Sequence, residues 1–104
     1  MDQVKIFKAL SNDTRLNILL WLKDPAANFE QQLHAGVMKD FQGGVCVRSI
    51  KKRTGLSQST TSKFMSILED AGLVESRKID QYTYFRRNEK MLKEITFWIN
   101  SDLY

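Results

Sequence analysis

One stretch of this chain, GLSQSTTSKFMSILEDAGLV at residues 55–74, constrains the fold more than any other part. Its first two helical turns carry hydroxyl and amide side chains, and hydroxyl groups are not favoured inside helices because they compete for backbone hydrogen bonds. Apolar side chains then recur at helical spacing, which predicts a helix that Ser57 caps and Gly72 ends. The expected buried side of this helix consists of Thr61, Phe64, Met65 and Leu68.

The segments on either side of this stretch complete a pattern. Before it, VCVRSIKKRT begins as a short apolar strand and continues as a helix, and Gly55 supplies the turn of a helix-turn-helix. After it, LVESRK and YTYFRR alternate around a turn at residues 79–81, which predicts a β-hairpin, and Asn88 can cap a last helix. The expected fold is mainly α with a small β-hairpin. It is a winged helix-turn-helix of order α-α-β-α-α-β-β-α, in a single domain over residues 1–104.

Two amphipathic helices are expected ahead of this unit. The first, VKIFKAL, places apolar side chains along one side, namely Val4, Ile6, Phe7 and Leu10. The second, TRLNILLWLK, follows a cap at Asn12 or Asp13 and ends before Pro25. Its expected buried stripe consists of Leu16, Leu19, Leu20 and Leu22.

Apolar residues recur every four positions through an insertion at about residues 24–44. These residues are Phe29, Leu33, Val37 and Phe41. Asn28 and Gln31 have the spacing of a capping box, while Gly36 and the glycine pair at 43–44 argue against one long helix. We therefore expect the insertion to be partly helical and packed. As hypotheses, it forms a wall of an effector pocket or stabilises a dimer.

The last helix, EKMLKEITFWINSDLY, has more apolar positions than one core-facing stripe requires. The alternatives are a helix wedged deep in the core and a helix that pairs with a second copy of the chain. Because a chain of this length has a small core, the surplus favours a homodimer. The expected dimer interface consists of Val4, Phe7, Met91, Leu92, Ile95, Trp98 and Ile99.

The composition bounds the class of protein. At 104 residues, 42% hydrophobic and 27% charged, the chain is typical of a globular domain, and it has no apolar run of about 18 residues to span a bilayer. Its start, MDQVKIFKAL, lacks the basic and apolar blocks of a signal peptide. The single cysteine, Cys46, forms no intramolecular disulfide. We expect a cytoplasmic protein with no membrane partner.

The excess positive charge, +4 overall, gathers around the hydroxyl-rich helix. Residues 47–90 carry ten Lys and Arg against five Asp and Glu, whereas residues 1–46 carry five of each. This basic field favours double-stranded DNA as the partner, because the major groove admits a helix and its base edges pair with Gln, Ser, Thr and Lys. The hairpin would follow the phosphate backbone as a wing through Arg77, Lys78, Arg86 and Arg87.

These segments together resemble the ArsR/SmtB family of small bacterial transcription factors. The resemblance covers residues 7–22 and 45–87, and LSQSTTS…L…L…AGLV is its most specific part. It implies a homodimeric winged helix-turn-helix repressor, paired through its first and last helices. Such a repressor would leave an inverted-repeat operator when an effector binds.

The resemblance also implies roles for individual residues on the helix and in the wing. With the cap, the expected DNA-binding residues are Ser57, Gln58, Ser59, Thr60, Ser62, Lys63, Arg77, Lys78 and Gln81. The wing departs from the family's usual Gly followed by Arg or Lys, since Asp80 and Gln81 stand there. An acid at the tip is expected to weaken phosphate contact.

The resemblance raises the question of a metal effector. Many members of the family sense thiophilic metals through a Cys-x-Cys pair, but this chain has Arg48 two positions after Cys46 and no His in its last helix. One thiolate does not complete a zinc-like site, so we expect no metal and no cofactor, and the effector stays unidentified. We expect Cys46 to be a small buried side chain. A redox role, or a site shared with His34, is the alternative.

Three other classes fit the sequence less well. A winged helix that binds protein in place of DNA would use the same hairpin and last helix, but it has no need for the flanking cations. An enzyme is not expected, because one His allows no Ser/His/Asp set and no phosphate-binding loop is present. A nonspecific nucleoid protein would carry a more uniform lysine face.

Overall fold

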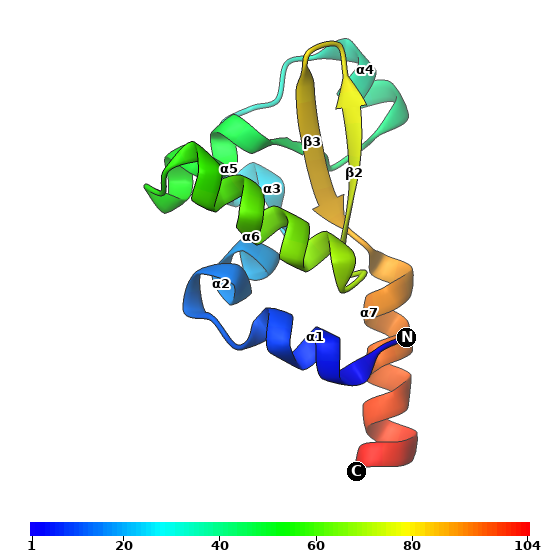
Figure 1. Cartoon of the computed structure of the whole chain (residues 1–104). Coiled ribbons are helices and arrows are strands. Elements are labelled where there is room, and N and C mark those ends of the chain that lie inside the picture. The colour runs from blue at the N-terminus through cyan, green and yellow to red at the C-terminus, as the bar shows by residue number, and fades with distance from the viewer.

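Helices surround a small antiparallel sheet in the computed structural model, which describes residues 1–104 (Figure 1). In chain order the elements are α1 (Gln3–Leu10), α2 (Asp13–Trp21), α3 (Pro25–Asn28), α4 (Ala35–Asp40), β1 (Val45–Cys46), α5 (Val47–Thr54), α6 (Gln58–Asp70), β2 (Val74–Ile79), β3 (Tyr82–Arg87), α7 (Glu89–Trp98) and the π-helical turn η1 (Ile99–Leu103). This order confirms the predicted winged helix-turn-helix and adds two short helices within the insertion.

Local side-chain hydrogen bonds set most helix starts. Asn12, Ser57 and Asn88 each cap a helix as predicted, by accepting from the backbone N–H three residues on. Gly55 adopts φ +73°, the left-handed conformation that closes α5 and turns the chain into α6. The predicted capping box at Asn28 is wrong, because that residue ends α3. The insertion helices are capped instead by Asp24 and His34.

The core lies between α1, α2, α5, α6 and the sheet. Of the predicted buried side of α6, Thr61, Met65 and Leu68 are completely buried, while Phe64 is only partly buried. The predicted stripe of α2 is half wrong. Leu19 and Leu22 are buried together with Ile18, while Leu16 and Leu20 are 39% and 56% exposed. The core-facing side of this helix is centred on residues 18, 19 and 22, which places positions 16 and 20 on the opposite side. In α1, likewise, Ile6 and Ala9 face the core.

The sheet has the strand order β1-β3-β2 and is antiparallel throughout. β2 and β3 pair from Val74↔Arg87 to Ile79↔Tyr82 around a tight turn, and β1 pairs with β3 at Val45↔Phe85 and Cys46↔Tyr84. Because α5 follows β1 directly, this short strand fastens the hairpin to the helix-turn-helix.

The insertion is partly helical and packed, as predicted. Val37 and Phe41 form a second small core with Cys46 and Tyr84. α4 therefore lies beside the outer part of the hairpin (Figure 1). Leu33, expected to continue the apolar repeat, is 76% exposed because it lies in the extended segment between α3 and α4.

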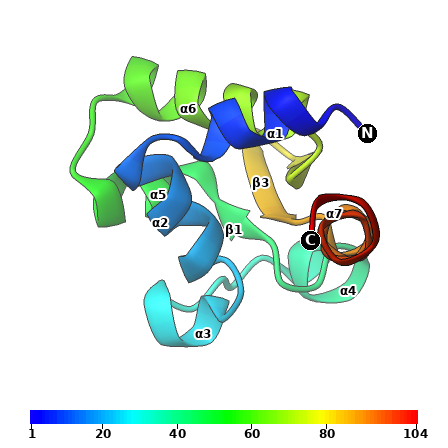
Figure 2. The same ribbon diagram turned by 90° about the horizontal axis from the view of Figure 1, so that it is seen from below.

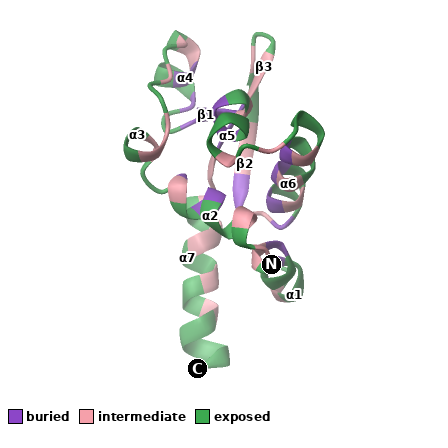
Figure 3. Ribbon diagram, turned by 90° about the vertical axis from the view of Figure 1, so that its left-hand side faces the viewer, coloured by how far each residue is buried: buried purple, intermediate pink, exposed green.

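α7 extends away from the rest of the molecule, and most of its surface is exposed (Figure 3). Met91, Leu92 and Ile95 pack against the main core from its first turns. Beyond them, Phe97 and Leu103 are 74% and 59% exposed. No helix is both long and apolar enough to cross a membrane.

Candidate nucleic-acid interface

α6 presents most of the predicted DNA-binding side chains to solvent. Gln58, Ser59, Ser62 and Lys63 are exposed, and Thr60 is half-buried at the edge. The helix is held from behind by Thr61, whose hydroxyl donates to the Ser57 carbonyl at 2.8 Å. Without a partner, the polar groups bond to one another, as when Gln58 Nε2 donates to Ser62 Oγ at 3.2 Å. Such groups can exchange these bonds for bonds to base edges or phosphates.

The insertion engages two of the four hairpin cations. Arg77 donates to the Asp40 carbonyl at 2.8 Å, and Arg86 donates to the Gln42 carbonyl at 3.2 Å. Both guanidinium groups lie over the ring of Phe41, at 5.2 and 4.1 Å from its centroid. Sequence reasoning missed these contacts because they join residues far apart in the chain.

The hairpin cations also differ in whether an acidic side chain of the protein pairs with them. Arg86 also pairs with Glu75 at 2.7 Å, and Arg87 pairs with Glu89 at 3.1 Å, both toward the base of the hairpin. Lys78 is exposed and forms no ion pair. Among the predicted wing residues, Lys78 is thus the cation without a protein partner.

The tip of the hairpin is tied to the insertion. Asp80 adopts φ +55°, a left-handed conformation for which Gly is favoured. Its carboxylate contacts His34 Nε2, and the other ring nitrogen of that histidine accepts from the Gly36 N–H. The acid that departs from the family pattern therefore has a partner within the chain. Beside it, Gln81 is exposed.

A hollow of about 380 Å³ separates α6 from the hairpin and brings predicted residues of both together. Gln58 and Ser62 line it from the helix, and Gln81 lines it from the wing. Arg48, which the sequence analysis did not include in the site, also lines it and lies over the Tyr82 ring at 3.9 Å. The nearby Cys46 side chain is the main cause that raises the pKa of the Arg48 guanidinium.

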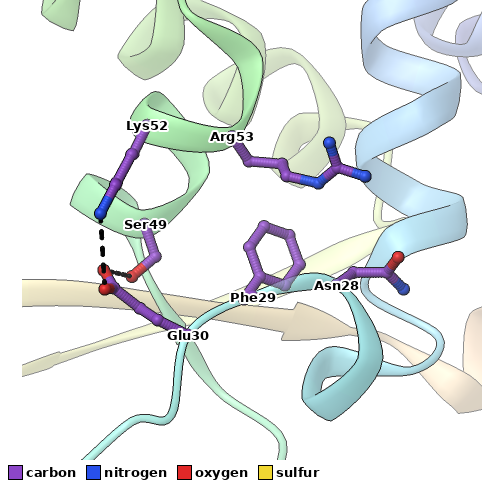
Figure 4. Close-up of a pocket in the computed structure, with 6 residues that line it drawn as sticks. All are labelled: Asn28, Phe29, Glu30, Ser49, Lys52 and Arg53. Carbon is purple, nitrogen blue, oxygen red and sulfur yellow. Dashed lines mark hydrogen bonds and ion pairs between the residues drawn. The ribbon is translucent and has the colours of Figure 1, made fainter.

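A second hollow lies between the insertion and α5 (Figure 4). Its volume is about 310 Å³, and it is lined by Asn28, Phe29, Glu30, Ser49, Lys52 and Arg53. Glu30 reaches across it, accepting from the Ser49 hydroxyl at 3.3 Å and pairing with Lys52 at 3.7 Å. The insertion therefore forms one wall of a pocket whose other wall is the first helix of the helix-turn-helix.

Cys46 is buried, as predicted, and has a free thiol. With His34 it lines an adjoining hollow of about 460 Å³, whose other residues include Arg48 and Tyr84. No cluster of three His, Cys, Asp or Glu side chains lies close enough to hold a metal ion. His34 is neither a core residue nor free in solvent, because it holds Asp80 and caps α4.

The predicted dimer residues differ in how far the chain's own core covers them. Met91, Leu92 and Ile95 are half-buried against the chain's own core. Val4, Phe7 and Ile99 are 63%, 45% and 36% exposed. Trp98 connects α7 to α1, because its ring centroid lies 6.2 Å from that of Phe7. The exposed parts of the first and last helices thus form adjacent apolar surfaces.

Comparison with known proteins matches this architecture. Residues 41–76, from the end of the insertion into β2, match the bacterial regulatory protein arsR family. YbzH of Bacillus subtilis, an uncharacterised HTH-type transcriptional regulator, is 37% identical over 103 residues, covering 99% of this chain and all of YbzH. The protein belongs to the arsR family. It is therefore a transcriptional regulator with a winged helix-turn-helix DNA-binding domain, as predicted.

Other arsR-type proteins are similar over most of the chain. A cadmium resistance regulatory protein CadC homolog of Staphylococcus aureus is 26% identical over 95 residues, covering 91% of this chain and 64% of its own length. A crystal structure of an ArsR family transcriptional regulator superposes with TM-score 0.71 at 18% identity, covering 97% of this arsR-family chain and 86% of its own. A homodimeric winged helix-turn-helix DNA-binding domain from Mycobacterium bovis superposes with TM-score 0.62 at 25% identity. The superposition covers 97% of this chain and 82% of the Mycobacterium bovis domain.

Proposed function

We propose that this arsR-family regulator binds an inverted-repeat operator as a homodimer and places α6 of each subunit in the major groove. The observation that carries the proposal is the division of α6 into two sides. Thr61, Met65 and Leu68 are fully buried, while the exposed side carries amide, hydroxyl and ammonium groups. Gln58 can pair with adenine, and Ser59, Ser62 and Lys63 can reach bases or phosphates.

The wing adds contacts to the DNA backbone. Lys78 is exposed and has no partner, and the exposed Gln81 donates only to the Tyr82 hydroxyl at 3.1 Å, whereas Arg77 reaches DNA only if it leaves the Asp40 carbonyl. We therefore assign Lys78 the main phosphate contact of the hairpin. The Asp80 carboxylate already has a partner in His34 Nε2, so one of its oxygens faces the insertion.

Dimerisation through α1 and α7 is supported by their adjacent apolar surfaces. Val4 and Phe7 lie on α1, Phe97 lies on α7, and Ile99 and Leu103 lie on η1, which continues α7. Exposed apolar area of this kind marks protein interfaces, and C2 pairing of identical chains is the commonest arrangement in oligomers. A C2 dimer would place two recognition helices on half-sites about one helical turn apart.

An effector that releases the operator is also part of the proposal. The pocket between the insertion and α5 supports it, because α5 packs directly against α6. A ligand that moved α5 would move the recognition helix with it. In this proposal the protein is a repressor, and the effector is the inducer that releases it from the operator.

Selection from a random pool of duplex DNA at about 0.15 M salt tests the operator, because nonspecific phosphate attraction is already weakened there. Enrichment of an inverted repeat with half-sites about one turn apart is the expected result. The alternative is a winged helix that binds another protein. Binding without enrichment, which fades evenly as salt rises, would contradict the proposal and direct the search to protein partners.

A further inference from the structure

Arg48 is an arginine outside the recognition helix and the hairpin, yet it lies where these two elements approach one another. Its side chain is exposed, and its guanidinium carbon lies 3.9 Å from the centroid of the Tyr82 ring. No Asp or Glu pairs with it, in contrast to Arg86 and Arg87. The chain therefore keeps this guanidinium on a rigid platform and leaves its charge without an acidic partner.

The surroundings of Arg48 are suited to an anion. The hollow of about 380 Å³ that it lines contains no carboxylate, and its other polar side chains come from Gln58, Ser62, Gln81 and Thr83. α5 begins at this hollow with Val47, and no side chain caps its first turn. The unpaired N–H groups of a helix start add partial positive charge to that of the arginine.

We propose that Arg48 binds a backbone phosphate of DNA in the hollow between α6 and the hairpin. This inference rests on the proposed function. If α6 lies in the major groove and the hairpin lies outside it, one DNA strand has to pass between them, over this hollow. A guanidinium presents a planar fork that bonds two oxygens of one phosphate, and the Tyr82 ring limits its motion before DNA arrives.

The test compares Arg48→Gln and Arg48→Lys with wild type on two duplexes, the selected operator and a scrambled sequence, over a series of salt concentrations. Arg48→Gln should weaken binding to both duplexes by a similar factor of about ten. Its plot of log affinity against log salt should lose about 0.9 in slope, the value of one phosphate contact. Arg48→Lys should keep the slope and lose part of the affinity.

Two further variants separate this site from general effects of charge and folding. Lys23→Gln removes an exposed cation in the turn between α2 and α3 and should leave affinity and slope unchanged, since α3 lies on the opposite side of the molecule from α6 (Figure 2). Tyr82→Leu keeps the charge of Arg48 but removes its platform, so affinity should fall with an unchanged slope. Circular dichroism and thermal melts of all variants confirm that each is folded.

The remaining outcomes show whether the phosphate site at Arg48 or the proposed DNA-binding function is wrong. Unchanged affinity and slope in Arg48→Gln, beside a wild type that binds, would overturn the phosphate site alone. A loss confined to the operator with an unchanged slope would also overturn it, because that result indicates a base contact. A wild type that binds neither duplex would overturn the proposed function, and this site with it.

Discussion

The imidazole of His34, which precedes α4, contacts the carboxylate of Asp80 at the tip of the hairpin. The same ring accepts from the Gly36 N–H at 3.0 Å and so caps the helix that it precedes. One side chain therefore fixes both the start of an insertion helix and the end of the wing.

Replacing His34 by Ala should lower the free energy of unfolding by about 1–2 kcal/mol, because the helix loses its cap. The contact with Asp80 should contribute less, since that carboxylate is largely exposed and exposed contacts of this kind stabilise little. Urea unfolding checks this, with Asp80→Asn as the control that keeps the cap. Equal losses in the two variants would show that the contact at the tip, and not the cap, is the stabilising element.

Replacing Gly44 by Ala should destabilise the packing of the insertion by about 1–3 kcal/mol. A Cβ at Gly44 would collide with the ring of Phe41 and lie 2.9 Å from its carbonyl oxygen. Gly43→Ala is the matched control. Gly43 has φ +82° but nothing within 4 Å of the added atom, so only the backbone cost of about 1 kcal/mol applies. Thermal unfolding should rank Gly44→Ala as the less stable variant, and the reverse order would contradict the close packing of Phe41.

Replacing Ser57 by Ala should destabilise the protein by about 1 kcal/mol, because the Thr60 N–H loses the hydroxyl that caps α6 at 3.2 Å. Ser66→Ala is the control, since Ser66 is exposed in the middle of the same helix and Ala favours that position. Urea unfolding should show a loss for the first variant and none for the second. A loss of similar size in both would mean that the cap is not the cause.

Replacing Tyr84 by Phe should alter the dependence of stability on alkaline pH. Burial is the main cause that raises the pKa of Tyr84 above its ordinary value of 10.0. The unfolded chain therefore releases this proton first, and the stabilisation, complete below pH 10, is lost as pH rises through the folded pKa. Denaturation at pH 9 and 11 should show a smaller alkaline loss for Tyr84→Phe than for wild type. Identical losses would mean that other groups control the alkaline unfolding.

Replacing Ile99 by Glu should convert the proposed dimer to monomer, because the change places a charge in the apolar surface formed by α7 and η1. Ile99 is 36% exposed in the single chain, so the monomer should remain folded. Leu33→Glu is the control, since Leu33 is exposed but lies in the insertion. Sedimentation should show a lower mass for the first variant alone. A wild type that is already monomeric would contradict dimerisation.

The helix-turn-helix could be predicted from the sequence because its signals are local. Ser57, Gly55 and Gly72 act on the backbone within a few residues, and the buried side of α6 follows from helical spacing. Periodicity alone was less informative in α2, where Leu16 and Leu20 are apolar but lie away from the core. Only the packing partners decide which side of such a helix is buried.

The environment of the wing could not be predicted, for a different reason. The pairing of Arg77 with the Asp40 carbonyl and the stacking of Arg86 on Phe41 join segments with no common sequence pattern. The sequence therefore gives no sign that the insertion engages two of the wing cations. The place of Arg48 beside the hairpin is equally hidden in the sequence, because it depends on the pairing of β1 with β3.

The docking of the insertion on the hairpin also determines the order in which parts of the chain can fold during synthesis. Three of its hydrogen bonds join residues 37 to 46 positions apart, so Val37 and Phe41 are synthesised well before Tyr84, which covers them. Closing such long loops costs entropy that contacts between neighbouring helices do not. The apolar side chains of the insertion therefore stay uncovered in the nascent chain until β3 has been synthesised. Only then can the wing and the insertion pack together.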